Sequence, residues 1–253
     1  MPTHCVSGKS GIRLVADVER QDCRPTVLFL HAGGENRTVW RPIAPAVEAL
    51  GWRTVTMDLR GHGDSDRAPS YRLDDFVDDV VTVVARFCGR HLVIVGGSIG
   101  GILGAIVEGE RRICVDGLVL LDTPTRLPSM EGPRSEVHKI ASAQARGAEA
   151  VASVDPKFLD STFLEDIGHD RDRLRRATRR LEIPVLIIGG ERSRYRTHVA
   201  ETAAREDIRH VEIAYVPGGH LVARDCPADV SRLIVGFLQR SWSRTLPTDV
   251  PSG

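Results

Sequence analysis

One serine in the sequence stands between glycines at the end of an apolar run. Residues 93–105 read VIVGGSIGGILGA, so the run stops at two glycines, Ser98 follows, and small apolar residues resume. Glycines allow a chain to turn sharply from a strand into a helix, and such a turn holds the hydroxyl exposed at the carboxyl end of the strand. This arrangement is typical of a nucleophile, and the alternative interpretation is a small polar residue in a tight turn.

Two further segments could supply the groups that a serine nucleophile needs. Residues 215–220 read YVPGGH, which places the imidazole of His220 on a loop after a predicted strand. Residues 31–34, HAGG, end another predicted strand, and a glycine-rich turn there can direct a backbone N–H towards the serine. The N–H of Ile99, at the positive end of the following helix, is a second donor for a developing oxyanion. His220 is the expected general base, whereas His31 is expected to be a structural hydrogen-bonding residue.

Composition limits the partners of this chain. Apolar residues make up 42% of its 253 residues and charged residues 27%, and 34 basic side chains balance 34 acidic ones, so nothing indicates binding to nucleic acid or an anionic membrane. Five scattered cysteines without a CxxC pair favour free thiols in a reducing compartment. No apolar run approaches the length of a membrane span. A cytoplasmic protein is expected, and its preference for arginine over lysine favours a bacterial source. A homo-oligomer is possible but not indicated.

Short apolar runs alternate with longer amphipathic segments along the chain. Strands are predicted at residues 12–18, 26–32, 53–59, 91–97, 117–123, 184–190 and 210–218. Several of them are continuously apolar, as central parallel strands covered on both faces are. Helical patterns lie between them at residues 39–50, 73–89, 99–110, 197–206 and 227–240. This alternation predicts the α/β class, with a doubly wound, mostly parallel sheet.

The alternation stops in the second half of the chain. Residues 124–181 contain helical patterns and no convincing strand, so we expect a helical cap inserted between two late strands. The α/β core then comprises residues 1–123 and 182–242, and residues 243–253, rich in Pro, Ser and Thr, are expected to be a disordered tail. Apolar residues of the cap could line a largely hydrophobic pocket, although most of them would bury the cap against the core. These residues are Leu127, Met130, Ile140, Phe158, Phe163 and Ile167.

Five motifs, taken in order along the chain, resemble those of the α/β-hydrolase fold superfamily. They are FLHAGGENRTVW (29–40), MDLRGHGDSD (57–66), GGSIGG (96–101), IPVLIIGGE (183–191) and VPGGHLVARDCPADV (216–230). The resemblance covers nearly the whole chain outside the expected cap and is to the small cap-bearing esterases, lactonases and C–C hydrolases. It implies Ser98 as nucleophile, His220 as base, and the backbone N–H groups of Gly33 and Ile99 as the oxyanion hole. The residues of the second motif are usually structural in this family.

One position departs from the family pattern. An aspartate usually follows the strand at 184–190 and orients the histidine, but Ser193 stands there, and a serine offers no negative charge to stabilise imidazolium. Three interpretations remain open: Asp122 is the acid, Glu191 reaches inward as the acid, or the protein has none and is a slow Ser-His dyad or does not hydrolyse. Asp122 is favoured slightly, because it follows the nucleophile strand by one βα unit and should lie on the neighbouring strand.

The expected reaction is acyl transfer through a serine ester, on a small, largely apolar ester, lactone or thioester. The alternatives are C–C bond hydrolysis, a lyase or cyclase reaction on a biosynthetic intermediate, and ligand binding without turnover. The serine argues against the dehalogenases and epoxide hydrolases of this fold, which attack with an aspartate. The sequence contains neither a metal-ligand cluster nor a phosphate-binding loop, so a small-molecule substrate is expected and a cofactor or metal is not.

Overall fold

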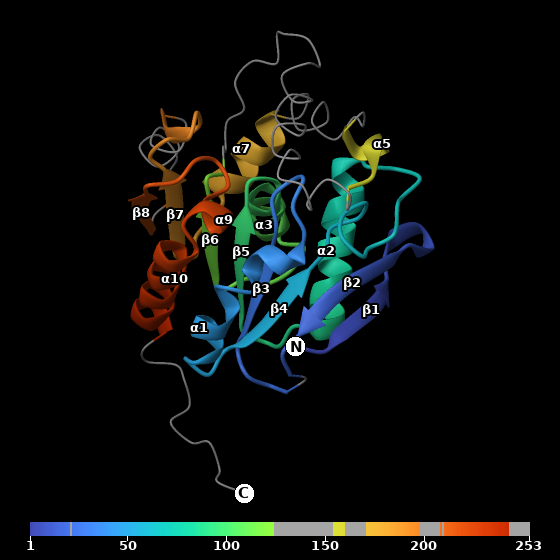
Figure 1. The fold of residues 1–253 in the computed structure, drawn as a ribbon, viewed down its shortest axis with the longest axis horizontal. Coiled ribbons are helices and arrows are strands. Elements are labelled where there is room, and N and C mark those ends of the chain that lie inside the picture. Colours follow the sequence, from blue (N-terminus) through green and yellow to red (C-terminus); the bar gives the residue numbers. More distant parts are fainter. Residues whose placement is uncertain (21, 124–153, 160–170, 198–207, 209, 243–253) are drawn as a thin grey trace, which may run out of the picture.

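The computed structural model describes the chain except for residues 21, 124–153, 160–170, 198–207, 209 and 243–253. One sheet has the strand order β1-β2-β4-β3-β5-β6-β7-β8 (Figure 1). The strands are Thr3–Ser7 (β1), Arg13–Val18 (β2), Thr26–Leu30 (β3), Arg53–Met57 (β4), Leu92–Gly97 (β5), Gly117–Leu121 (β6), Val185–Gly190 (β7) and Val211–Val216 (β8). The helices are Lys9–Gly11 (η1), Arg37–Trp40 (η2), Ala44–Glu48 (α1), Leu73–Phe87 (α2), Ile99–Gly109 (α3), Pro156–Leu159 (α5), Arg171–Arg179 (α7), Val222–Asp225 (α9) and Pro227–Trp242 (α10).

The sheet is parallel from β4 to β8, and β1 and β2 join its edge as an antiparallel pair. The carboxyl ends of parallel strands meet at one edge of the sheet, so the residues that follow β3, β5, β6 and β7 are brought together there. In the registers, Leu30 pairs with Gly96, and Gly97 pairs with Leu121. The side chain of Ser98 and that of Asp122 therefore start from adjacent strand ends.

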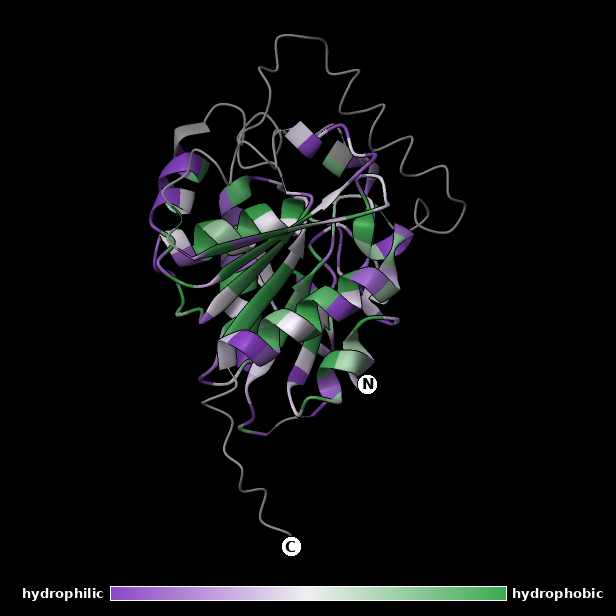
Figure 2. Cartoon of the chain, turned by 90° about the vertical axis from the view of Figure 1, so that its left-hand side faces the viewer, coloured by the Kyte–Doolittle hydropathy of each residue, from purple (hydrophilic) through white to green (hydrophobic). Residues whose placement is uncertain are grey.

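Helices cover both faces of the sheet, because alternate side chains of each central strand point to opposite faces and both sets are apolar. Leu28 and Leu30 of β3 pack into the layer formed with α2, α3 and α7. Val27 and Phe29 of the same strand pack into the layer formed with η2, α1 and α10. Figure 2 shows hydrophobic strands between helices whose outer faces carry hydrophilic residues. The predicted doubly wound α/β class is confirmed.

One edge of the sheet and one helix differ in detail from the expectations. The strand β1 was not expected, because its residues alternate between exposed and half-buried and its apolar signal is weak. The helix expected at residues 39–50 is divided into η2 and α1, with Pro42 and Pro45 near the division. Proline lacks the N–H group that a continuous helix needs and clashes with the preceding turn.

Part of the expected cap can be described. The helix α7 packs on α3, where a Cβ at Gly109 would lie 2.4 Å from the carbonyl oxygen of Ala177. The short helix α5 carries Phe158, which is buried, and the other five apolar residues expected in the cap lie outside the described residues. The tail and all but the first residue of the helix expected at 197–206 also lie outside them. Among the described helices, none is long and apolar enough to cross a membrane.

Candidate active site

Ser98 occupies a strained turn between β5 and α3. Its backbone has φ 47° and ψ −108°, a region that side-chain-bearing residues rarely adopt. Its N–H donates a hydrogen bond of 3.0 Å to the carbonyl oxygen of Leu121, which fixes the turn to the neighbouring strand β6. The residue is half-buried, so the hydroxyl lies at the carboxyl edge of the sheet rather than in the core. Such backbone strain is often stored at functional sites.

Glycines on both sides of Ser98 permit this turn. A Cβ at Gly96 would lie 2.4 Å from the backbone of Gly100, and a Cβ at Gly100 would lie 2.3 Å from the carbonyl oxygen of Leu30. Real Cβ atoms do not approach backbone atoms so closely, and backbone cannot move aside as a flexible side chain can. The helix α3 therefore begins directly against β3 and β5 because both positions lack a side chain.

His220 lies on the loop between β8 and α9 and faces the serine. Its Nε2 atom is 3.0 Å from Ser98 Oγ, and its Nδ1 atom is 2.6 Å from Asp122 Oδ2. A carboxylate only accepts hydrogen bonds, so the proton on the ring belongs on Nδ1 and leaves Nε2 free to accept from the serine. The His220 side chain is 15% exposed, and the ring of Tyr195 lies against it with centroids 4.8 Å apart.

Asp122 follows β6 and is completely buried. Its φ is 43°, a second positive value in a residue other than glycine at this edge, and its N–H donates to the carbonyl oxygen of Ile188 at 2.7 Å. Besides His220, the carboxylate accepts the N–H of Gly190 on Oδ1 at 3.0 Å and the hydroxyl of Ser193 on Oδ2 at 2.5 Å. Three donors compensate the burial of this charge. Glu191, the other candidate acid, is exposed.

The turn that follows β3 lies beside the start of α3. A Cβ at Gly33 would lie 2.6 Å from Cδ1 of Ile99, so the two candidate oxyanion-hole residues are neighbours. Neither backbone N–H has a hydrogen-bond acceptor in the part of the chain that the structure describes. Two N–H groups without acceptors beside a serine hydroxyl suit the stabilisation of a developing oxyanion.

Glu35 forms hydrogen bonds within the same turn. Its Oε2 atom accepts the N–H of Ala32 at 3.3 Å, its own N–H donates to the carbonyl oxygen of Ala32 at 3.1 Å, and its Oε1 atom is buried without a partner. Burial raises the pKa of Glu35 to about 7, because removing a carboxylate from water disfavours its charged form. A buried carboxyl group with a pKa near neutrality is therefore hydrogen-bonded within the turn that carries Gly33.

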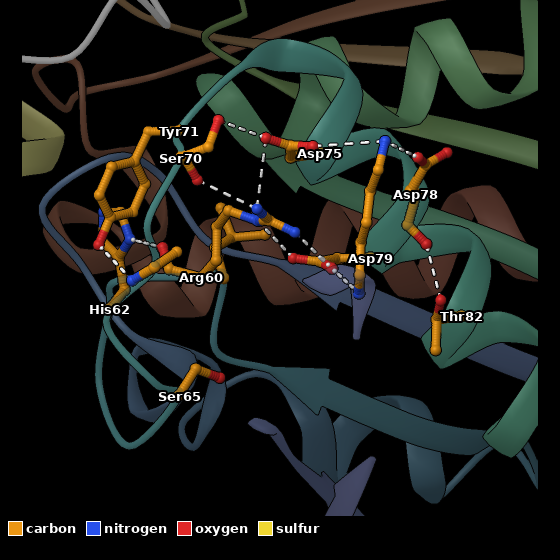
Figure 3. A network of polar contacts seen from close by, with 12 residues as sticks. Arg60, His62, Ser65, Ser70, Tyr71, Asp75, Asp78, Asp79 and Thr82 are labelled. Carbon is orange, nitrogen blue, oxygen red and sulfur yellow. Dashed lines mark hydrogen bonds and ion pairs between the residues drawn. The ribbon is translucent and has the colours of Figure 1, made fainter. Parts of the chain in front are cut away.

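The polar residues of the MDLRGHGDSD motif hold loops in place through hydrogen bonds, as expected. Asp58 is buried and accepts the backbone N–H of Arg37 at 2.7 Å. Arg60 forms two hydrogen bonds to the carboxylate of Asp79 in α2, at 2.7 and 2.8 Å (Figure 3). His62 contacts the backbone carbonyl of Arg60 through Nδ1 at 2.9 Å. None of these side chains forms a hydrogen bond with the Ser98 side chain among the described residues.

His31 is also structural. Its Nε2 atom accepts the N–H of Leu59 at 3.0 Å, and its ring lies 5.1 Å from that of His62, centroid to centroid. Burial lowers the pKa of His31 to about 4 and that of His62 to about 3, so both rings are neutral at pH 7.

Sequence reasoning did not assign three residues near the site. Ser193 was recognised only as a missing acid, although its hydroxyl contacts the carboxylate of Asp122. Tyr195 gave no signal, whereas Glu35 could have been noticed as an acid directly after the glycine turn. Among the described residues, no group of histidine, cysteine, aspartate and glutamate side chains could hold a metal ion.

Comparisons with known proteins agree with this architecture. The family model of the alpha/beta hydrolase fold matches residues 25–167. Proline iminopeptidase PfmaB of Pestalotiopsis fici is 32% identical over 119 residues, which are 45% of this chain and 42% of that protein. The sn-1-specific diacylglycerol lipase ABHD11 of Mus musculus is 25% identical over 249 residues, which are 85% of this chain and 81% of that protein. A hydrolase from Pseudomonas aeruginosa superimposes with a TM-score of 0.72 at 22% identity, covering 93% of this chain and 98% of that one.

Proposed function

Because the chain belongs to the α/β hydrolase fold family, we propose that it is a serine hydrolase that cleaves a small, largely apolar ester, lactone or thioester through an acyl-enzyme. One observation carries the proposal: His220 is within hydrogen-bond distance of the Ser98 hydroxyl on one side and of the buried Asp122 carboxylate on the other. This is the geometry that a general base needs to activate a serine. Relatives named as an iminopeptidase and a lipase support a hydrolase.

Acylation begins when Ser98 Oγ attacks the carbonyl carbon of the substrate and its proton moves to His220 Nε2. The carbonyl electron pair moves to the oxygen, which accepts hydrogen bonds from the N–H groups of Gly33 and Ile99. Collapse of this intermediate expels the alcohol or thiol, which takes the proton from His220. A water molecule then attacks the carbonyl carbon of the acyl-enzyme and gives its proton to His220. Ser98 Oγ takes that proton as it leaves, and the carboxylic acid is released. The Asp122 carboxylate stabilises the imidazolium form of His220 in both steps.

Apolar side chains beside the oxyanion loop support an apolar substrate. Ile99 is next to Gly33, and Cε1 of Phe158 would lie 3.8 Å from a Cβ at Gly33. Both side chains are buried, and neither offers a charge or a hydrogen bond to a ligand. An acyl chain without charged groups suits such walls.

Covalent labelling with a fluorophosphonate, combined with hydrolysis of p-nitrophenyl acetate and butyrate, tests the proposal. The wild-type protein should be labelled once, on Ser98, and should hydrolyse the esters. The Ser98→Ala variant should show neither labelling nor hydrolysis. The matched control is Ser231→Ala, which removes a buried serine from α10 and should retain both. A folded wild-type protein that is neither labelled nor active on esters would contradict the acyl-enzyme and favour ligand binding or non-covalent chemistry.

A further inference from the structure

Ser193 stands where the family usually has its acid, and its hydroxyl contacts Asp122, the acid of the proposed function. It follows β7, whereas Asp122 follows β6, and the two strands are adjacent. The Ser193 side chain is buried, with the residue 8% exposed. Its Oγ atom is 2.5 Å from Asp122 Oδ2, the same oxygen that His220 Nδ1 approaches at 2.6 Å.

The direction of this hydrogen bond follows from a second contact. The backbone N–H of Tyr195 donates to Ser193 Oγ at 3.1 Å, so this oxygen is an acceptor on that side. A carboxylate offers no proton, and the hydroxyl hydrogen of Ser193 therefore points at Asp122. The turn itself is held by the N–H of Ser193, which donates to the carbonyl oxygen of Gly190 at 3.0 Å. Backbone N–H groups thus hold both ends of the contact, that of Tyr195 at Ser193 and that of Gly190 at the Asp122 carboxylate.

We propose that Ser193 is a positioning residue, which holds the Asp122 carboxylate against His220 and shares its negative charge. This inference rests on the proposed function, because it assigns Ser193 a role through Asp122. The hydroxyl and the imidazole compete for one oxygen, so the hydrogen bond from Ser193 weakens the attraction between Asp122 and protonated His220. It also fixes the carboxylate in the orientation that Nδ1 of His220 requires.

A purely structural role for Ser193 has a different consequence. In that case the hydroxyl would only satisfy a buried carboxylate, and its removal would cost stability without changing proton transfer at His220. The two roles differ in whether the effect of removing the hydroxyl depends on the carboxylate. They also differ in whether the pH dependence of the reaction changes.

Four proteins separate these roles: wild type, Ser193→Ala, Asp122→Asn and the double variant. The measurement is the rate of Ser98 labelling by a fluorophosphonate, followed across pH, with thermal unfolding as the check on folding. Ser193→Ala should slow labelling at pH 7 about tenfold, the effect expected for one hydrogen bond to a charged group. The acid limb of the pH–rate profile should move to higher pH, because the freed carboxylate attracts the imidazolium more strongly. In the Asp122→Asn background the same change should have no further effect.

An equal loss in both backgrounds, or an unmoved acid limb, would overturn the positioning role. Labelling that depends on Asp122 but not on Ser193 would overturn this inference alone and leave the proposed function intact. Absence of labelling in the wild-type protein would instead contradict the proposed function itself. The Ser231→Ala variant, which removes a buried hydroxyl from α10, controls for a general effect of losing a buried hydroxyl.

Discussion

At the scale of single residues, the candidate site combines two strained backbones on adjacent strands. Ser98 and Asp122 both have positive φ values, although neither is glycine. Each is held by a backbone hydrogen bond to the next strand, through Leu121 and Ile188 respectively. A strained conformation persists only where its surroundings determine it fully, and parallel strands on both sides do so here. The strain directs a hydroxyl and a carboxylate towards one imidazole.

Replacing each candidate acid by its amide should show which of the two orients His220. Asp122→Asn should lower kcat for ester hydrolysis by about 10⁴, because an amide cannot stabilise imidazolium and favours the wrong tautomer. Glu191→Gln should leave kcat within a factor of about two, since an exposed side chain without that contact adds little. Steady-state kinetics on p-nitrophenyl butyrate measure both. Near-wild-type turnover in Asp122→Asn would eliminate Asp122 as the acid.

The effect of a carboxylate at position 193 on kcat should depend on which residue occupies position 122. In the wild-type background, Ser193→Asp would put two carboxyl groups in contact, because the present oxygens are 2.5 Å apart. Like charges at this distance cannot both be ionised, so kcat should fall at least about tenfold at pH 7. In the Asp122→Asn background the same substitution should raise kcat above that of Asp122→Asn alone. Ester hydrolysis by the three variants gives the comparison, and a further loss in the double variant would contradict it.

At the scale of elements, the site depends on how closely α3 approaches the sheet. Gly100→Ala should abolish folding or activity, because its Cβ would meet the carbonyl oxygen of Leu30 at 2.3 Å. The matched control is Gly236→Ala in α10, whose Cβ would meet only the movable end of Arg240 at 3.0 Å. Removing a helical glycine there should stabilise the protein by up to about 1 kcal/mol. Urea unfolding of both variants measures the contrast, and equal behaviour would argue against the close approach of α3.

A second contact between elements holds α5 beside the oxyanion loop. The hydroxyl of Tyr71 (labelled in Figure 3) donates to Asp155 at 2.6 Å and accepts the N–H of Ala68 at 3.0 Å. Asp155 precedes α5, whose Phe158 packs edge-on against the rings of Tyr71 and His62. The contact thereby determines where this aromatic ring lies.

Tyr71→Phe should therefore loosen α5 while leaving the rest of the core intact. The free energy of unfolding should fall by about 1–3 kcal/mol, because two buried polar groups lose their partner. Amide exchange in residues 155–158 should accelerate more than exchange in β5. Hydrogen–deuterium exchange read by mass spectrometry measures the difference between the two segments. A uniform acceleration would indicate global destabilisation rather than release of α5.

The central strands could be predicted from sequence because each is a continuous apolar run. The sharp turn at Ser98 could be predicted because glycines occupy the positions where two backbones come into contact. The pairing of His220 with Asp122 required strand order, which sequence restricts but does not determine. The edge strand β1 was missed because it is too exposed to carry an apolar pattern. The contact between Ser193 and Asp122 depends on the path of one loop, which no periodicity encodes.

At the scale of the whole molecule, three buried titratable groups at the carboxyl edge couple stability to pH. His31 and His62 have folded-state pKa values of about 4 and about 3, below the ordinary value of 6.5. The unfolded chain therefore binds more protons than the folded one below about pH 6.5, so these two groups favour unfolding as the pH falls towards 4. Glu35 acts in the opposite direction, because burial raises its pKa from 4.5 to about 7, and the folded state binds the extra proton between these values.

Glu35→Gln should consequently make the protein more sensitive to acid. Between pH 7 and pH 5 the free energy of unfolding should fall more steeply in the variant than in wild type, because the variant keeps the two histidines and loses the opposing carboxyl group. The slopes of the free energy of unfolding against pH should differ by up to about 1.4 kcal/mol per pH unit, the value expected when the folded and unfolded states differ by one bound proton. Urea titrations of both proteins at several pH values measure it, and Glu48→Gln in α1 is the control at a half-buried glutamate. Parallel curves for wild type and Glu35→Gln would mean that Glu35 titrates in the folded protein as it does in the unfolded chain.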